Sequence, residues 1–392
     1  MRNLYLLHAT IVLEDTLLQQ GFIHIKDDKI EAVGDMVNCP IIANSNRVVD
    51  CSEHRYVMPG MIDIHVHGAA GFDFMDGSHE AFEGIALALA KEGTTSFLAT
   101  TITNPAEQTM DTLKNLEDYQ KQKNGPGFAD MLGIHLEGPF INKKKKGAQP
   151  ESAIIPPNAA IFREWQTLSG NTIKVITFAP ELDEQFELLA ELKKTHVIPS
   201  MGHTDASYDE VLQAIQHGVR HATHLFNGMK GMHHRDPGVV GAALLQDEVH
   251  VEIIPDGIHF HPDLLKMIVK MKGLEKVLVI TDGMRAKGMP DGEYDLGGQQ
   301  VTVRDGKCLL ANDSLAGSIV TMNQARLNLA IWLSLSIHEQ IQITSINQAK
   351  RLGQFDRKGS IQAGKDADIV VIGQDGEVEL TICRGSIAYE RN

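Results

Sequence analysis

The sequence predicts an α/β fold, a (β/α)8 TIM-like barrel that carries a small β-sandwich domain built from both chain ends. Three observations lead to this prediction. The middle of the chain alternates apolar strand-like runs with helical stretches, which is typical of a parallel sheet built from βαβ units. Eight such runs fall between residues 57 and 355, enough for a closed eight-stranded barrel. The two chain ends carry short strand-like runs without helices between them.

The strands at the chain ends are short and are separated by turn residues. At the N-terminal end we expect strands at residues 4–8, 10–13, 22–26, 29–33 and 47–50, with a tight turn over residues 26–29. At the C-terminal end we expect strands at residues 367–373, 378–384 and 386–389. Residues 1–56 and 356–392 are therefore predicted to form the small β domain, and residues 57–355 the barrel.

The eight barrel strands are predicted at residues 61–67, 94–100, 131–137, 172–179, 196–203, 219–224, 249–256 and 276–282. Apolar residues recur at helical spacing over residues 79–92, 182–194 and 208–217, which predicts helices there. Gly93 and Gly218 follow two of these stretches and are suitable helix ends. The crossovers before residue 172 and after residue 224 are less clearly helical.

The composition limits the kinds of partner. Lys and Arg total 36 against 51 Asp and Glu, a formal net charge of −15, which argues against nucleic acid or an anionic membrane as partner. No apolar run is long enough to span a bilayer, and the N-terminus lacks the pattern of a secretory signal. The four cysteines form no Cys-x-x-Cys motif, so neither a zinc knuckle nor a disulfide framework is indicated. We expect a cytoplasmic protein.

His65 and His67 lie two residues apart in the first predicted barrel strand. On a strand, both side chains then point to the same face. Two neutral imidazoles side by side form half of a site for a divalent metal ion. A pair of hydrogen-bonded histidines without metal is the alternative.

Further histidines and carboxylates end other predicted strands, where the loops of a barrel build active sites. Each of them alone could be a solvated loop residue or a helix cap, but their shared position on six strands favours a metal centre. Nitrogen and carboxylate ligands suit zinc or iron better than calcium or magnesium. The predicted metal-binding residues are His65, His67, Glu137, His203, His224 and Asp282. The spacing is compatible with one ion or with two, the second held by the two histidines of the first strand.

A metal ion at such a site polarises a carbonyl group and lowers the pKa of a bound water. Asp282, predicted to be the catalytic residue, could take the proton of that water and pass it to a leaving amine. The predicted chemistry of the barrel is therefore hydrolysis of an amide or a related C–N bond.

Several sequence blocks carry a resemblance to a known family. They are Pro59-Gly-Met-Ile-Asp63, His135-Leu-Glu-Gly-Pro139, Gly202-His-Thr204, Thr223-His-Leu-Phe-Asn-Gly-Met229, Arg235-Asp-Pro-Gly238, Asp256-Gly-Ile-His259, Thr281-Asp-Gly283, Leu315-Ala-Gly-Ser318 and residues 358–368. In these blocks the chain resembles the amidohydrolase superfamily, and in detail its N-acetylglucosamine-6-phosphate deacetylase family. The resemblance implies hydrolysis of N-acetylglucosamine 6-phosphate to glucosamine 6-phosphate and acetate, in amino-sugar catabolism and cell-wall recycling.

The resemblance also implies roles for individual residues. Glu137, His203 and His224 match the metal ligands common to the family, and the His-x-His pair matches members that hold a second ion. The residues implied in substrate binding are Ala148, Gln149, Asn227, Gly228, Arg235, His259, Leu315, Ala316 and Gly317. In the family, a neighbouring subunit supplies part of the phosphate grip, which implies a homodimer.

One position departs from part of the family. Gln149 stands where some members have a histidine; it can donate a hydrogen bond to a sugar hydroxyl but cannot carry charge near neutral pH. Residues 143–146, four consecutive lysines, are more typical of a solvated loop than of a phosphate clamp. Two rival functions are another amidohydrolase, acting on a related N-acetylhexosamine phosphate or a cyclic amide, and an inactive scaffold. The phosphate-gripping residues argue against the cyclic amide, and the retained metal ligands against the scaffold.

Overall fold

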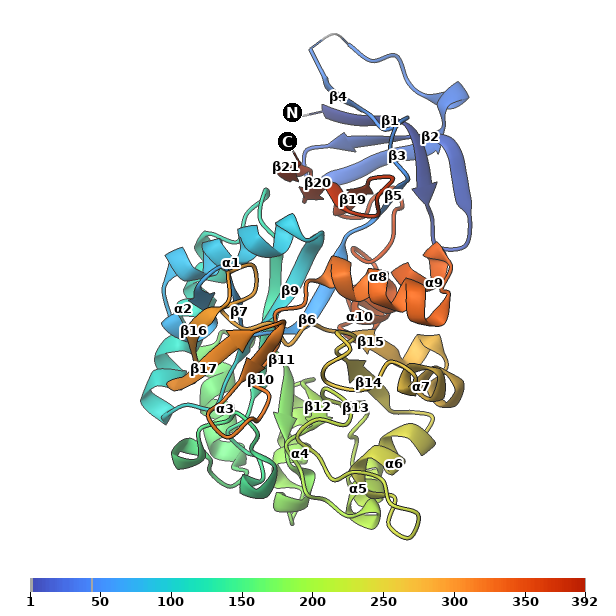
Figure 1. The fold of residues 1–392 in the computed structure, drawn as a ribbon. Coiled ribbons are helices and arrows are strands. Elements are labelled where there is room, and N and C mark those ends of the chain that lie inside the picture. The colour runs from blue at the N-terminus through green and yellow to red at the C-terminus, as the bar shows by residue number, and fades with distance from the viewer. Residues whose placement is uncertain (1–2, 44, 392) are drawn as a thin grey trace.

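The computed structural model describes residues 3–43 and 45–391, and its centre is a parallel sheet of eight strands (Figure 1). In sheet order from one edge to the other, the strands are β6 (Met61–Val66), β9 (Thr94–Thr101), β10 (Asp130–Glu137), β11 (Ile173–Phe178), β12 (Ile198–Met201), β13 (His221–Ala222), β14 (His250–Ile253) and β15 (Val277–Val279). The order in the sheet is the order in the chain, as in a barrel wound in one direction.

The two edges of this sheet meet. The backbone N–H of Asp282, just after β15, donates to the carbonyl of His65 in β6 at 2.9 Å, and the N–H of His67 donates to the carbonyl of Gly283 at 2.8 Å. Val66 and Gly283 form a parallel bridge. The predicted (β/α)8 barrel is therefore confirmed, and its seam lies directly at the metal-binding motif of the first strand.

Helices surround the barrel. They are α1 (His79–Lys91), α2 (Ala106–Gln122), α3 (Ala159–Leu168), α4 (Glu187–Lys194), α5 (Tyr208–Gln216), α6 (Gly238–Leu245), α7 (Leu264–Lys272), α8 (Met322–Leu333), α9 (Ile337–Ile341) and α10 (Asn347–Arg351), with a π-helical turn at Gln342–Ile346. Short 3₁₀ turns lie at Met36–Asn38, Phe74–Asp76, Lys143–Lys145, Glu151–Ala153, Pro180–Leu182 and Leu274–Lys276. The two unclear crossovers contain α3 and α6.

One predicted helix begins later than expected. The helical pattern over residues 182–194 becomes a 3₁₀ turn followed by α4, which begins at Glu187. Phe186 has a left-handed backbone with φ of 54°, which an α-helix does not continue through. The Asp183 carboxylate accepts hydrogen bonds from the N–H groups of Leu188 and Leu189, so it caps the helix at its actual start.

Four predicted strands extend too far. The strands expected at residues 196–203, 219–224, 249–256 and 276–282 end at Met201, Ala222, Ile253 and Val279. His203, His224 and Asp282, which follow three of them, have positive φ values of 47°, 28° and 50°. The backbone therefore leaves the strand conformation at these side chains, and periodicity alone does not predict such a turn.

Both chain ends join in one second sheet, at the top of Figure 1. Its strand order is β21 (Ser386–Glu390), β20 (Val378–Cys383), β19 (Ile369–Ile372), β5 (Tyr56–Pro59), β1 (Asn3–Val12), β2 (Leu17–Lys26) and β3 (Lys29–Asp35), with β4 (Arg47–Asp50) also paired to β1. This agrees with the predicted β-rich part formed from both termini. The two strands expected at residues 4–8 and 10–13 are one strand, β1, whose pairing with β2 is irregular around His8.

A small antiparallel sheet between β15 and α8 was not predicted. It consists of β16 (Gly292–Leu296), β17 (Gln299–Arg304) and β18 (Lys307–Leu309), and a two-stranded ribbon, β7 (Gly68–Ala69) and β8 (Phe72–Asp73), follows β6. Leu296, Val301 and Ala316 pack in a separate apolar cluster, and Ser314, Leu315 and Gly317 beside it line a cavity shared with residues that follow the barrel strands. Within residues 3–43 and 45–391, no helix combines the length and apolarity needed to cross a membrane.

Candidate metal centre and active-site cavity

A cavity of about 280 Å³ lies where the barrel strands end. It is lined by side chains from most of the strand-end loops: His67, Ile102, Glu137, Gly147, Ala148, Gln149, His203, His224, Asn227, Gly228, His259, Asp282, Leu296, Ser314, Leu315 and Gly317. The lining combines charged and imidazole groups with small and apolar residues. Such a combination is typical of a small-molecule site.

Glu137, His203 and His224 form the first group of possible ligands. The Nε2 atoms of the two histidines lie 3.2 and 3.1 Å from Glu137 Oε1 and 3.3 Å from each other. The Nδ1 atom of His203 lies 2.8 Å from the carbonyl of Lys145, and that of His224 lies 3.1 Å from the carbonyl of Asn227. Since a carbonyl only accepts, each Nδ1 carries the proton and each neutral ring turns the lone pair of Nε2 to the carboxylate.

This arrangement fits a divalent cation. Two imidazole lone pairs and a carboxylate oxygen, all acceptors, converge on one point in a buried place, and acceptors facing one another repel unless a positive charge lies between them. Two histidines and one glutamate are a ligand set that zinc takes in catalytic sites.

His65, His67 and Asp282 form a second group beside the first. The Nε2 atoms of the two histidines lie 3.4 and 3.2 Å from Asp282 Oδ1, and 3.5 and 3.3 Å from the two oxygens of Glu137. His65 Nε2 and His67 Nδ1 are buried and have no hydrogen-bond partner among the described residues. Glu137 lies between the two groups, so its carboxylate could be shared by two ions.

The electrostatics of the centre favour positive charge. Burial alone would raise the pKa of Asp282, but His65 and His67 lower it to about 2. Burial alone would lower the pKa of His224, but its hydrogen bond to Glu137 and the charge of that carboxylate raise it to about 9. The carboxylate thus favours a positive charge at Nε2, either a proton or a metal ion bound to the lone pair of the neutral ring. Two ionised carboxylates that draw positive charge onto their neighbours are the electrostatic environment that a metal ion neutralises.

Glycine makes room for one of the ligands. Gly228 has φ of 58°, and a Cβ atom built on it would lie 2.8 Å from His203 Nδ1. Any larger residue would therefore push the His203 ring away from Glu137. This gives a steric reason for glycine at a position that the sequence resemblance assigns to substrate binding.

Most of the predicted substrate-binding residues reach the cavity, but two do not line it. Ala316 is completely buried and packs in the apolar cluster of Leu296 and Val301. Arg235 is exposed in the loop after Lys230, and its guanidinium donates to His234 Nε2 at 2.7 Å. The cavity of a single chain is thus formed without Arg235. Asp236, its neighbour, pairs with Lys230 at 2.8 Å instead.

The structure gives Gln149 other partners than the predicted sugar hydroxyl. Its side chain is only 2% exposed. Its Nε2 donates to Glu137 Oε2 at 2.7 Å, and its Oε1 accepts from the backbone N–H of Thr103 at 2.9 Å. The amide is used at both ends, so Gln149 supports the metal-facing carboxylate. Gln149 also lines the cavity, so its contact with a sugar hydroxyl stays a prediction.

The lysine run lies outside the cavity, in keeping with a solvated loop. Lys144 and Lys145 lie 3.6 and 3.7 Å from the carboxylate oxygens of Asp205.

His259 does line the cavity, and its Nδ1 lies 2.7 Å from Asp256 Oδ2. The sequence prediction had no role for Glu252, an acid inside an apolar strand, although it is fully buried and touches His65.

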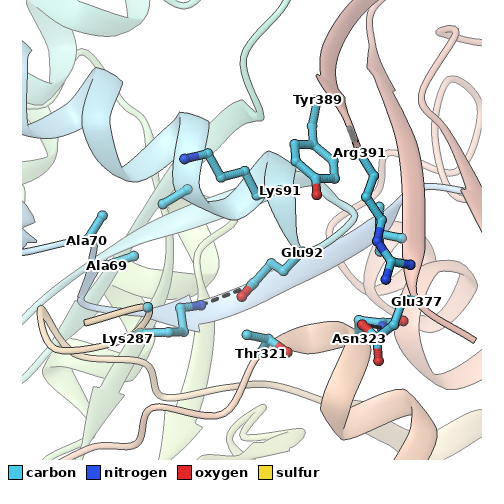
Figure 2. A pocket seen from close by; sticks show the side chains of 13 residues that line it. Ala69, Ala70, Lys91, Glu92, Lys287, Thr321, Asn323, Glu377, Tyr389 and Arg391 are labelled. Atoms are coloured by element: carbon cyan, nitrogen blue, oxygen red, sulfur yellow. Dashed lines mark hydrogen bonds and ion pairs between the residues drawn. The ribbon is translucent and has the colours of Figure 1, made fainter. Parts of the chain in front are cut away.

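A larger cavity of about 480 Å³ lies at the junction of the barrel and the second sheet (Figure 2). Lys91 and Glu92 at the end of α1, Lys287, and Tyr389 and Arg391 of the last strand region surround it. Lys287 and Glu92 form a buried ion pair of 3.0 Å on its floor. None of the three histidine and carboxylate groups found among the described residues lies there, so the smaller cavity is the candidate active site.

The comparison with known families agrees with this geometry. The model of the amidohydrolase family matches residues 56–388, which is most of the chain. This chain belongs to the amidohydrolase family. The superfamily expected from the sequence blocks is therefore confirmed, and metal-dependent hydrolysis is the chemistry of this amidohydrolase.

Its relatives define a narrower group. The chain is 44% identical to N-acetylglucosamine-6-phosphate deacetylase of Bacillus subtilis (strain 168), over 99% of this chain and 97% of that one. It is 34% identical to N-acetylgalactosamine-6-phosphate deacetylase of Escherichia coli O157:H7, over 84% and 87% of the two chains. The crystal structure of N-acetylglucosamine-6-phosphate deacetylase from Pasteurella multocida superimposes with a TM-score of 0.91, at 30% identity, over 98% of this chain and 99% of that chain. The more specific family prediction is confirmed as well.

Proposed function

We propose that this amidohydrolase removes the acetyl group of N-acetylglucosamine 6-phosphate, giving glucosamine 6-phosphate and acetate. The observation that carries the proposal is the convergence of two ligand groups on Glu137, in a cavity that also holds Asn227, Gly228 and His259. The relatives named N-acetylglucosamine-6-phosphate deacetylase support the choice of substrate.

A divalent cation, zinc or iron, would be held by Glu137, His203 and His224, with His65, His67 and Asp282 offering a place for a second, and would polarise the amide carbonyl and acidify water. Asp282 supplies the proton transfer. Its carboxylate, which is ionised because its pKa is lowered to about 2, accepts a proton from the attacking water as the new C–O bond forms. It then delivers that proton to the amine nitrogen as the C–N bond breaks.

The walls of the cavity suit the two ends of the substrate. Leu315 and Gly317 offer a small apolar surface for the acetyl methyl group. His259, oriented through Nδ1 by Asp256, and the Asn227–Gly228 turn offer polar groups for the sugar and its phosphate.

We further propose that the enzyme acts as a homodimer. Arg235 is exposed and has no carboxylate within ion-pair distance among the described residues, and Met232 beside it is 56% exposed. A loop that presents an apolar side chain and a guanidinium without a carboxylate partner fits contact with a second copy, whose phosphate site the arginine would complete.

The remaining parts of the proposal concern organisation and location. We propose that residues 1–56 and 356–392 form one domain and residues 57–355 the catalytic domain, which the pairing of both chain ends in one sheet supports. Residues 1, 2, 44 and 392 lie outside the described residues. A cytoplasmic location is supported by the four free cysteines, Cys39, Cys51, Cys308 and Cys383, because a reducing compartment keeps thiols free.

A second candidate substrate is N-acetylgalactosamine 6-phosphate, because one relative carries that name. Acetate release should be measured on both N-acetylhexosamine 6-phosphates and on their unphosphorylated forms, with metal content determined on the same sample. We expect the highest kcat/KM with N-acetylglucosamine 6-phosphate. Faster hydrolysis of the galactosamine epimer, or of an unphosphorylated sugar, would contradict the proposed substrate.

A further inference from the structure

Glu252 is a completely buried carboxylate in β14, inside the barrel. It accepts three hydrogen bonds. His65 Nδ1 lies 3.1 Å from its Oε2, the backbone N–H of His224 donates to the same oxygen at 3.2 Å, and His221 Nε2 lies 3.0 Å from its Oε1. Two of these three partners belong to residues of the proposed metal centre, so Glu252 lies directly behind it.

The hydrogen bonds beyond Glu252 have only one possible direction. Arg351 in α10 donates from Nε to His221 Nδ1 at 3.2 Å. A guanidinium only donates, so His221 accepts at Nδ1 and must carry its proton on Nε2, towards Glu252. Burial lowers the pKa of His221 to about 4, which keeps the ring neutral. Arg351 has no ion-pair partner of its own among residues 3–43 and 45–391. Its positive charge therefore balances the negative charge of Glu252 through the neutral ring of His221.

The same rule determines which ring nitrogen of His65 carries the proton. A carboxylate only accepts, so Nδ1 of His65 carries the proton and Nε2 keeps its lone pair. That lone pair faces Asp282 Oδ1 at 3.4 Å and Glu137 Oε1 at 3.5 Å. The opposite tautomer would turn an N–H towards the ion and an unpaired lone pair towards Glu252.

His65, His135 and Glu252 also lie close enough together to suggest a third metal group, but hydrogen bonds already occupy them. His135 Nδ1 lies 3.0 Å from the carbonyl of Ile64, and its Nε2 lies 2.7 Å from Thr177 Oγ1. With both ring nitrogens engaged, His135 has no lone pair free for an ion. His65, His135 and Glu252 therefore form a hydrogen-bonded network that supports the metal centre.

We infer that Glu252 is a positioning residue that holds His65 in the tautomer and orientation needed to bind the second divalent cation. This inference rests on the two-ion centre of the proposed function. The first ion depends less on Glu252, because backbone carbonyls of Lys145 and Asn227 orient the rings of His203 and His224. Loss of such an outer partner typically weakens metal binding by about 10- to 100-fold.

The test compares metal binding by the full-length protein and four variants. Glu252→Leu removes every acceptor, and Glu252→Gln keeps one oxygen that can still accept from His65. Arg351→Lys weakens the hydrogen bond to His221, which in turn is hydrogen-bonded to Glu252. Glu92→Gln is the matched control, because Glu92 is also a buried glutamate in an ion pair, with Lys287 (Figure 2), but touches none of the metal-facing histidines.

The measurement is Co²⁺ or Zn²⁺ titration of metal-free protein in a metal buffer, followed by elemental analysis and, for Co²⁺, the visible absorption of the ion. We expect two ions in the wild type and in the control. In Glu252→Leu the affinity for the second ion should fall by about 10- to 100-fold, while the first changes only a few-fold. Glu252→Gln should lose less than Glu252→Leu, which is the rescue expected of a retained acceptor.

Each other outcome is informative. Two ions of wild-type affinity in both Glu252 variants would contradict the inference and leave the proposed function intact. A single ion in the wild type would contradict the two-ion centre itself. Equal weakening of both ions in Glu252→Gln and Glu92→Gln would assign the effect to general destabilisation and overturn the inference. If Glu252→Leu does not fold, the Glu252→Gln and Arg351→Lys variants decide in the same way.

Discussion

Gln149 and Glu137 form a direct hydrogen bond in the active-site cavity, with Nε2 of the amide 2.7 Å from Oε2 of the carboxylate. The other end of the amide accepts from the backbone of Thr103. Glu137 belongs to one group of possible metal ligands and lies 3.5 and 3.3 Å from the two histidines of the other. A neutral amide thus supports the central ligand at a position where a contact with the sugar was expected.

The first prediction concerns this pair. Gln149→Leu should leave a buried carboxylate oxygen and the Thr103 N–H without their partner, at a cost of about 1.5–3 kcal/mol for a hydrogen bond to a charged group. We expect weaker metal retention and a fall in kcat, with KM for the substrate nearly unchanged. Metal analysis after dialysis and steady-state kinetics test this. A large rise in KM with kcat and metal content intact would instead favour the original contact with substrate.

The second prediction concerns Asp282. Asp282→Asn keeps the size of the side chain but removes the proton acceptor, and a positioned general acid–base is worth about 10²–10⁴ in rate. We expect kcat to fall by that factor in protein matched for metal content and folding. Nearly full kcat in such protein would mean that another group transfers the proton.

The third prediction concerns the role of Arg235 in substrate recognition. Loss of one charge-assisted hydrogen bond, about 1.5–3 kcal/mol, should lower kcat/KM of Arg235→Ala by roughly 10- to 150-fold. The loss should occur with N-acetylglucosamine 6-phosphate and be nearly absent with N-acetylglucosamine. Because both substrates are assayed on one preparation, general damage to the protein cancels in the ratio. Equal losses would show that the guanidinium does not recognise the phosphate.

The fourth prediction distinguishes an arginine of the same chain from one of the partner chain. Arg235→Ala and Asp282→Asn proteins, each of low activity at substrate concentrations below KM, should be mixed under conditions that exchange the subunits of the proposed dimer. In a hybrid dimer, the Arg235→Ala chain keeps Asp282 and receives the arginine of its partner. Equal random mixing should then restore about a quarter of the wild-type activity, since half of the dimers regain one of two sites. No recovery, with hybrids verified by mass, would contradict the exchange of Arg235 between subunits.

The fifth prediction concerns acid stability. At the junction with the second sheet, Asp130 lies 2.9 Å from Lys358 and 3.4 Å from Arg384. Burial alone would raise the pKa of Asp130, but these cations lower it to about 2. A carboxyl pKa below its unfolded value of about 3.9 stabilises the fold above that pH, and the contribution disappears as the pH falls from about 4 to 2.

The size of this effect follows from the shift. The difference from the unfolded pKa is worth roughly 2.5 kcal/mol at neutral pH. The free energy of unfolding of Asp130→Asn should therefore be lower than that of the wild type at pH 7, and the difference should shrink as the pH approaches 3. Denaturant unfolding at several pH values measures it, with Asp375→Asn, an exposed ion-paired aspartate, as control. A difference that does not depend on pH would contradict an ionic origin.

Local patterns in the sequence predicted the barrel fold of this enzyme and the positions of several candidate metal ligands. The alternation of apolar runs and amphipathic helices predicted the barrel, because strand and helix periods are properties of consecutive residues. The same reasoning placed Glu137 and the His65–His67 pair at strand ends, since the carboxyl ends of parallel strands meet at one face of a barrel.

What only the tertiary structure decided concerns contacts between residues far apart in the chain. His203, His224 and Asp282 have a left-handed backbone, which opposes the local preference of these residues and is stabilised by the surrounding packing. The strands therefore end before the apolar runs that predicted them. Glu252 meets His65 across 187 positions, because the closed barrel brings their strands to one interior. Gln149 meets Glu137 because the loop that follows β10 returns to the end of that strand. The sequence alone determined which side chains are available for metal chemistry and the order of the strands that carry them. The choice of hydrogen-bond partners within the centre required the closed fold, since a buried polar group takes the partner that three-dimensional packing leaves within reach.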